Sequence, residues 1–345
     1  MKQVKIYQAL DDRLRDKWYT LWKKSNSGHF FNTPEWFSSY CDTYGVHKAK
    51  IVTIEENGEL LLVFPLILEN VFGMQAWVSP GGKFVNKSSL LTKRFDKTLA
   101  KLLIPPLQGF GNVYLCELLE KEAALFTSLQ TDWVQQEASR NPFLHLSSKT
   151  LTNLSPKLLS RIRNTMKKHA KALHFFAYKG DPSALETAFA LDAQSTKAKQ
   201  GKETFCKKDQ DFFRTLLERL PEHMVVDLIY YEKTPVIYSI GVTYKKTYEA
   251  LLTAYNAQYR KIRPGKLLTY ALMKRLQKAR FILFDFGRGE SVLKREFTKD
   301  VRRQYTVFYT SNPVTKVWWN WANNFRAIIL HNQLLYQTYL IFKKR

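Results

Sequence analysis

Apolar side chains recur along this chain at two spacings, one typical of amphipathic helices and the other of strands. The first predicted helix places four large apolar residues on one face: Leu14, Trp18, Leu21 and Trp22. Asp11 or Asp12 is in position to cap its first turn. A second helix is predicted to begin at Thr33-Pro34 and to end at Gly45.

A hairpin and a further helix and strand follow. Ala49–Ile54 and Leu60–Leu68 flank Asn57-Gly58, a pair that supplies the positive φ angles of a tight turn. The remaining predicted elements of this half are a helix from about Ser88 to Leu103, stopped by Pro105-Pro106, and a strand at Val113–Leu118. This order predicts a mixed α/β unit.

The second half repeats that plan. A helix begins at Ser155-Pro156, two more lie near Ser183–Gln194 and Asp209–Leu220, and a hairpin joins Val225–Glu232 to Val236–Tyr244. Ser147-Ser148-Lys149-Thr150 breaks the apolar periodicity between the halves. We therefore predict one domain over residues 1–150, a second over 151–312 and a helical tail over 313–345.

The segment 251–294 contains the clearest site signal, a strand, a cationic turn, a helix, a strand and a glycine turn. In the turn Arg263-Pro264-Gly265-Lys266, the positive end of a helix lies beside Arg260, Arg263 and Lys266, and Gly265 permits a close approach to the backbone. A diphosphate fits such a turn. The alternative interpretation is an ordinary capped surface helix with solvated lysines.

The apolar run Phe281–Phe284 predicts a buried strand, and Asp285-Phe286-Gly287-Arg288-Gly289-Glu290 follows it, with Lys294 soon after. Together with Tyr255-Asn256 and the Pro-Gly turn, these motifs resemble the acyl-CoA N-acyltransferase (GNAT) superfamily. The likeness is to its two-domain branch of Fem-type transferases and CelD/BcsL-like acetyltransferases. The segment Asn32–Trp36 also resembles the start of that family, whereas Asp192–Lys197 lacks the His and Trp of many relatives.

The resemblance implies an α+β fold of two tandem GNAT-like domains with mixed, mostly antiparallel sheets and an aromatic C-terminal helix. It implies that an amine attacks the carbonyl of acetyl-CoA or another acyl-CoA directly, with no metal. Lys294 is the candidate cation for the oxyanion, Asp285 or Glu290 for accepting the amine's proton, and Tyr255 for protonating the leaving thiolate. The predicted cofactor contacts are Arg260, Arg263, Gly265, Lys266 and Arg288.

Charge is unevenly distributed over the chain. Residues 1–150 hold 18 Lys or Arg and 15 Asp or Glu, while residues 151–345 hold 36 and 15, so the net charge of +24 lies mostly in the second half. Such a field attracts phosphate-bearing ligands, nucleic acid or an anionic membrane surface. The predicted helix after Ser155 carries six Lys or Arg. These residues form either a solvated face or a border of the ligand groove.

Other sequence features restrict the class of protein. Cys41, Cys116 and Cys206 are widely spaced and indicate neither a zinc site nor a disulfide framework. We find no signal peptide and no apolar run of about 18 residues, and therefore expect a cytoplasmic protein. The phosphate-binding G-x-x-x-x-G-K-[ST] loop, G-x-G-x-x-G, H-E-x-x-H and G-x-S-x-G are absent.

In the tail, Trp318, Ala322, Phe325 and Ile329 recur at helical spacing, which favours core packing over a membrane anchor. Peripheral contact with an anionic membrane remains the alternative.

Three function classes stay open at this point. The first is a CoA-dependent N-acyltransferase acting on a small molecule, a sugar or a cell-envelope precursor. The second is a Fem-like transferase that uses aminoacyl-tRNA, although residues 184–220 lack the heptads of the long helical hairpin found in some of them. The third is a non-catalytic basic module that binds nucleic acid or a membrane surface.

Overall fold

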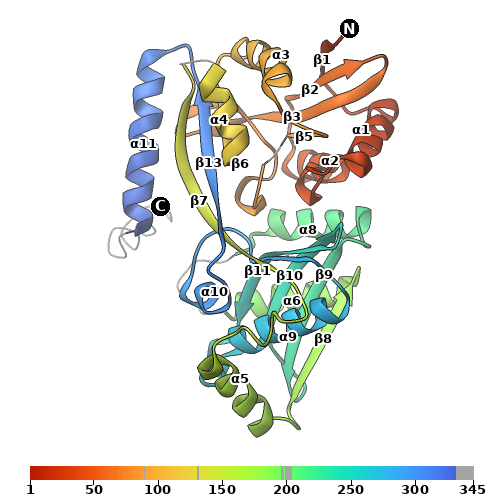
Figure 1. Cartoon of the computed structure of the whole chain (residues 1–345), viewed down its shortest axis with the longest axis vertical. Helices are drawn as coiled ribbons and strands as arrows, with labels where there is room; N and C mark the ends of the chain where they lie inside the picture. Colours follow the sequence, from red (N-terminus) through yellow and green to blue (C-terminus); the bar gives the residue numbers. More distant parts are fainter. Residues whose placement is uncertain (89, 130–131, 196–197, 199–203, 332–345) are drawn as a thin grey trace.

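A computed structural model describes residues 1–88, 90–129, 132–195, 198 and 204–331. The upper lobe in Figure 1 is built from the first half of the chain. Its strands are β1 (Gln3–Tyr7), β2 (Ala49–Glu56), β3 (Glu59–Val71), β4 (Met74–Val78), β5 (Leu91–Thr92), β6 (Val113–Leu119) and β7 (Val134–His145). Its helices are α1 (Asp12–Lys24), η1 (Phe30–Asn32), α2 (Pro34–Tyr44), η2 (Gly82–Phe84), α3 (Lys97–Gln108) and α4 (Glu120–Leu129).

The lower lobe comes from the second half (Figure 1). Its strands are β8 (Leu173–Lys179), β9 (Met224–Tyr231), β10 (Thr234–Tyr244), β11 (Thr247–Tyr255) and β12 (Leu283–Asp285). Its helices are α5 (Pro156–Lys168), α6 (Pro182–Ala193), α8 (Lys207–Arg219), η3 (Ala257–Ile262), α9 (Pro264–Lys278) and α10 (Val292–Phe297). The chain then returns to the upper lobe through β13 (Val301–Tyr309) and α11 (Pro313–His331).

The two lobes share strands. The strand order is β1-β2-β3-β4-β6-β13-β7-β12-β11-β10-β9-β8, and β5 pairs with β3. β13, from the second half of the sequence, lies between β6 and β7, while β7 continues into the lower lobe and pairs with β12. Only β4 with β6 and β11 with β12 pair in parallel among the described strands. The predicted mixed, mostly antiparallel sheets are confirmed.

Side-chain caps and turns define most element ends where the sequence predicts them. Asp11 accepts the N–H of Leu14 at the start of α1, and Thr33 accepts that of Trp36 at the start of α2. Gly45 ends α2 with a φ of 67°. The four apolar residues of the first helix are all buried, which confirms the predicted face. In the lower lobe, Ser155 caps α5 in the same way.

One predicted helix is placed wrongly. α3 begins at Lys97, because Asp96 accepts the N–H groups of Thr98 and Leu99, and the segment before it forms β5 instead. Pro105 and Pro106 lie inside α3 and do not stop it at residue 103. The physical reason is burial, since Leu103, Ile104 and Leu107 all pack in the core of the upper lobe.

The predicted stripe on the tail helix is also wrong. Ala322 is buried, but Trp318 and Phe325 are 40% and 46% exposed, and the fully buried aromatic residue is Trp319. α11 therefore packs on the sheet through a face rotated by one residue from the predicted one. The side chain of Ile329 and residues 332–345 lie outside the described part of the chain.

The lobes also pack through helices. α2 of the upper lobe lies against α8 of the lower one, with the rings of Trp36 and Phe212 5.1 Å apart. One apolar cluster includes side chains from both lobes. This shared core, together with the exchanged strands, fixes the position of the lower lobe's loops relative to the upper lobe.

Candidate functional site

The cationic turn lies where β11 leads through η3 into α9. Pro264 is the first residue of α9 and is buried, whereas Arg260 and Arg263 are exposed. Arg263 adopts a φ of 54° and its side chain does not cap the helix. The amino end of α9 thus presents exposed guanidinium groups at the positive end of the helix dipole, an arrangement that favours an anion.

Helix α10 lies directly beside this turn. A Cβ at Gly265 would come 3.1 Å from Leu293 Cδ2, a tight contact with the end of that side chain. Lys266 Nζ forms an ion pair with Glu296 of α10, 2.6 Å between nitrogen and oxygen. An incoming phosphate would compete with Glu296 for this ammonium group.

The glycine loop after β12 lies on the other side of α10. Gly287 and Gly289 have φ angles of 74° and 79°, which few residues other than glycine adopt. Lys294 Nζ donates to three carbonyl oxygens of the loop, those of Gly287 (2.9 Å), Arg288 (3.0 Å) and Gly289 (2.8 Å). The ammonium group of Lys294 therefore holds the loop in its curved shape.

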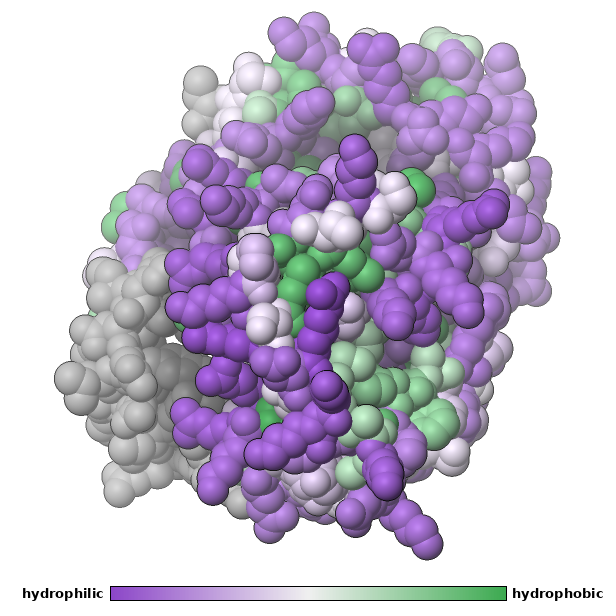
Figure 2. Space-filling model, turned by 60° about the horizontal axis from the view of Figure 1, so that its bottom comes forward, coloured by the Kyte–Doolittle hydropathy of each residue, from purple (hydrophilic) through white to green (hydrophobic). Residues whose placement is uncertain are grey.

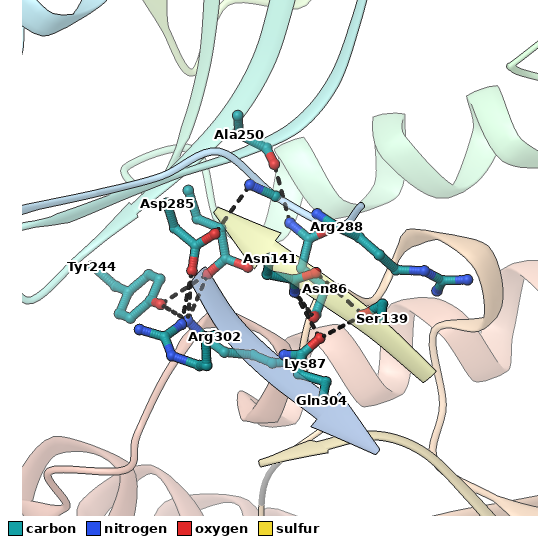
Figure 3. Close-up of polar contacts among 12 residues, drawn as sticks. Asn86, Lys87, Ser139, Asn141, Tyr244, Ala250, Asp285, Arg288, Arg302 and Gln304 are labelled. Carbon is teal, nitrogen blue, oxygen red and sulfur yellow. Dashed lines mark hydrogen bonds and ion pairs between the residues drawn. The ribbon is translucent and has the colours of Figure 1, made fainter. Parts of the chain in front are cut away.

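Two asparagines of the upper lobe also form hydrogen bonds with the loop (Figure 3). Asn86 Oδ1 accepts the N–H of Arg288 at 3.2 Å, and Asn86 Nδ2 donates to the carbonyl of Ala250 in β11 at 3.0 Å. Asn141 Oδ1 accepts the N–H of Gly289 at 3.2 Å. Both asparagines are nearly fully buried. The loop is consequently shaped by side chains of both halves of the chain.

A buried ion cluster lies under the loop, also drawn in part in Figure 3. Lys87 Nζ lies 2.9 Å from Glu249 Oε2 and 3.9 Å from Asp285 Oδ2, and Arg302 Nη1 donates to Asp285 Oδ2 at 3.0 Å. Tyr244 donates to Glu249 as well. Burial raises the pKa of the Glu249 carboxyl, although the ammonium group of Lys87 opposes the shift. These charges compensate one another across the boundary between the lobes.

The structure gives the predicted catalytic residues different surroundings. Asp285 is 1% exposed, is paired with Arg302 and accepts the N–H of Gly287, so its carboxylate already has partners. Glu290 is exposed just after the loop. Tyr255 is partly buried at the end of β11. Their catalytic roles, like that of Lys294, stay predictions.

The predicted cofactor residues fall into two neighbouring groups. Arg260, Arg263, Gly265 and Lys266 form the turn, and Arg288 lies in the loop across α10, where its Nε is 3.2 Å from Glu117 Oε1. Arg288 is thus partly neutralised by the upper lobe. Among the described residues, no group of three or more His, Cys, Asp or Glu is placed to hold a metal ion.

Sequence reasoning missed the contribution of the upper lobe. Residues of the first half whose side chains contact the loop or the ion cluster include Asn86, Lys87, Glu117 and Asn141. They belong to no local motif. The one sequence signal is an ionisable residue within an apolar strand, as with Glu117 in β6 and Glu249 in β11, which indicates a buried pairing without naming the partner.

Two strands separate between the turn and the loop. β11 pairs in parallel with β12 only from Thr247 to Glu249 and then continues to Tyr255. The chain after β12 bends instead into the glycine loop. The edge of β11 beyond Glu249, which β12 does not pair with, therefore leads from the loop toward the cationic turn.

Comparison with known proteins assigns this region to a family. Residues 156–295, which contain the turn, the loop and Lys294, match the acetyltransferase (GNAT) domain family. No curated protein sequence matches this chain.

Solved structures match nearly the whole chain. FemX has 10% identity and a TM-score of 0.65, covering 91% of this chain and 99% of FemX. The C-terminal domain of a putative lysylphosphatidylglycerol synthetase from Agrobacterium fabrum has 10% identity and a TM-score of 0.58, covering 92% and 96%. A tandem GNAT protein from the clavulanic acid biosynthesis pathway has 8% identity and a TM-score of 0.50, covering 91% and 99%. At these identities the likeness concerns the fold, and it confirms the prediction of two tandem GNAT-like units.

Proposed function

Because residues 156–295 match the GNAT domain family and the chain has the fold seen in FemX, we propose that it is an N-acyltransferase that moves an acyl group from acyl-CoA to an amine. The observation that carries the proposal is the exposed Arg260 and Arg263 at the amino end of α9, which follows the part of β11 that does not pair with β12. A diphosphate bound at the turn would direct the rest of an acyl-CoA along that edge toward the glycine loop.

In the proposed reaction the amine nitrogen attacks the thioester carbonyl, and the carbon–sulfur bond then breaks as the tetrahedral intermediate collapses. The nitrogen loses a proton and the departing thiolate gains one. In this proposal exposed Glu290 takes the proton, directly or through water, and Tyr255 donates a proton to the thiolate. Positioning of the two reactants supplies much of the rate.

The contacts of the glycine loop favour main-chain oxyanion stabilisation. Lys294 already donates to three carbonyls, and the N–H groups of Gly287, Arg288 and Gly289 are bonded to side chains. We therefore propose N–H groups of β11 beyond Glu249 as the oxyanion donors, with Lys294 and Asp285 keeping the loop in shape. In this mechanism those two residues position the site without touching the reacting atoms.

A second candidate is transfer from aminoacyl-tRNA, which the basic helix α5 favours. Lys157, Arg161, Arg163, Lys167 and Lys168 are all exposed, while Leu158, Leu159 and Ile162 face the core. α5 packs against α9 at the end of the molecule shown in Figure 2, where hydrophilic side chains surround a central apolar area. A large polyanion would contact α5 and the turn together.

Thermal stability with each donor separates the candidates. A ligand at 100 times its Kd stabilises the native state by about 2.7 kcal/mol. We expect acetyl-CoA to raise the melting temperature of the purified protein and uncharged or aminoacylated tRNA to leave it unchanged. Stabilisation by aminoacyl-tRNA alone would favour the second candidate, and no response to either donor would favour a non-catalytic module.

The turn itself is tested by calorimetry. Arg260→Ala combined with Arg263→Ala is expected to weaken acetyl-CoA binding by about 2 kcal/mol or more, because charge-assisted bonds contribute roughly 1.5 to 3 kcal/mol each. The control is Lys274→Ala with Lys278→Ala, which removes the same charge from exposed positions of α9 away from the turn. Equal affinity of the two double variants would remove the turn from the binding site.

A further inference from the structure

Helix α11 has two apolar faces, and only one of them packs on the protein. Thr315, Trp319 and Ala322 are buried against the sheet of the upper lobe. There the ring of Trp319 makes T-shaped contacts with those of Tyr114 and Phe308. The neighbouring face carries the outer row, which we define as Val314, Val317, Trp318, Trp321 and Phe325. Val314 and Val317 are 71% exposed and Trp321 is 53% exposed. Such a contiguous apolar row on a surface helix indicates a binding surface.

The outer row is ordered by its own contacts. Trp318 and Trp321 stack with ring centroids 5.3 Å apart, and Trp321 and Phe325 stack at 5.0 Å. Trp318 Nε1 donates to the carbonyl of Phe72 in the upper lobe, which fixes the row relative to the sheet. The described residues that line a shallow hollow of about 520 Å³ here are Pro313, Val314, Val317, Trp318 and Trp321. The polar atoms that would orient a small metabolite are missing from this lining.

The charge of the residues around the outer row indicates which kind of partner it binds. No acidic residue follows Asp300 in the sequence, whereas α11 contains Lys316 and Arg326, and Lys343, Lys344 and Arg345 follow it. A second copy of this chain would bring the same excess of positive charge to the contact, and the two would repel. An anionic bilayer attracts the basic segment while its headgroup region accepts tryptophan, phenylalanine and valine side chains.

We propose that α11 docks this protein on an anionic membrane surface, with the outer row inserted among the headgroups and the helix axis parallel to the bilayer. No helix in the described ranges is long and apolar enough to cross a bilayer, which agrees with a peripheral contact. The contact is independent of the acyl donor. Its effect is to hold the catalytic lobe close to acceptors at a membrane surface.

Vesicle sedimentation with the full chain tests the proposal. We expect the protein to sediment with phosphatidylcholine vesicles that contain about 30% phosphatidylglycerol, to bind neutral phosphatidylcholine vesicles far more weakly, and to be released by added salt. The double variant Val317→Ser with Trp321→Ser should reduce partitioning into anionic vesicles about tenfold or more, because serine side chains do not insert among the headgroups as valine and tryptophan do.

The matched control is Ile6→Ser with Phe176→Ser, two exposed apolar residues on β1 and β8. This variant should bind like the unmodified chain, and all forms should unfold cooperatively at similar temperatures. The proposal is overturned if the α11 variant and the control bind equally, or if neutral and anionic vesicles bind alike. It is also overturned if vesicles do not bind and light scattering shows a dimer that only the α11 variant dissociates, which would make a second copy the occupant.

Discussion

At the scale of single residues, the two glycines of the loop differ although both have positive φ. A Cβ at Gly287 would lie 2.2 Å from the carbonyl oxygen of Ala250, whereas nothing lies within 4 Å of a Cβ at Gly289. Gly287→Ala should therefore destabilise the fold by clearly more than Gly289→Ala, which carries only the backbone strain of about 1 kcal/mol. Urea unfolding measures both. Equal losses would show that the close approach to β11 relaxes freely.

A second residue-scale prediction concerns Glu122, whose carboxyl is buried at the start of α4. Burial raises its pKa from 4.5 to about 8, although N–H groups of the backbone oppose the shift. The folded state then holds a proton that the unfolded state releases, so this residue lowers the free energy of unfolding as pH rises from about 4.5 to 8. The loss reaches on the order of 4 kcal/mol above pH 8.

Glu122→Gln removes this titration. We expect the difference in melting temperature between the variant and the unmodified chain to grow in favour of the variant as pH rises from 5 to 8. A cost of the amide that does not depend on pH would shift this difference by the same amount at every pH. The comparison variant is Glu120→Gln, which lies on the same helix. If the melting temperatures of Glu122→Gln and the unmodified chain change with pH in parallel, the raised pKa is contradicted.

At the scale of elements, the glycine loop depends on strands that are distant in sequence. Asn86 connects the loop to β11, and Asn141 of β7 supports its next residue. Asn86→Ala leaves the N–H of Arg288 and the carbonyl of Ala250 without this partner, and each such loss costs roughly 1 to 3 kcal/mol when buried. We predict faster amide exchange at residues 287–289 and a lower kcat with little change in the KM for the acyl donor.

The control for that prediction is Asn112→Ala. Asn112 also makes two side-chain hydrogen bonds, donating to the carbonyl of Gln75 and accepting from the hydroxyl of Thr310, but it lies in the upper lobe before β6 and contacts neither the loop nor β11 in these bonds. If both variants lower kcat equally, the effect of Asn86 is general destabilisation and not positioning of the loop.

At the scale of the whole molecule, the exchanged strands make the halves depend on each other. Residues 1–150 lack β13, whose Val307 and Phe308 are fully buried between β6 and β7, and residues 151–345 lack the β7 segment that pairs with β12. We predict that neither half alone unfolds cooperatively and that the two, expressed together, form a one-to-one complex. Calorimetry and light scattering measure this.

A matched design restores only the missing strand. Residues 1–146 joined by a short Gly-Ser turn to residues 298–310 bring β13 back beside β7, since the chain ends already meet where Phe143 donates to Asp300. This fusion should unfold cooperatively where 1–150 does not. Cooperative unfolding of 1–150 by itself would mean that the predicted domain boundary is also a folding boundary.

The sequence by itself determined what depends on near neighbours along the chain. Periodicity, the caps at Asp11, Thr33 and Ser155, and the Asn57-Gly58 turn predicted elements that the structure contains, because capping and turn formation act over three or four residues. The motif from the cationic turn to Lys294 likewise lies on contiguous chain, and it identified the family. Local propensity failed where burial overrode it, at Pro105 and Pro106.

Tertiary structure alone decided what depends on segments far apart in the chain. The insertion of β13 beside β7, the contacts of Asn86 and Asn141 with the loop, and the pairing of Lys87 with Glu249 all join residues whose spacing carries no periodic signal. Each charge of the ion cluster can be buried only because a charge of opposite sign lies beside it, since removing an isolated ion from water costs too much free energy. Only the tertiary structure shows that Lys294, predicted from the sequence as the cation for the oxyanion, donates to three carbonyls of the loop.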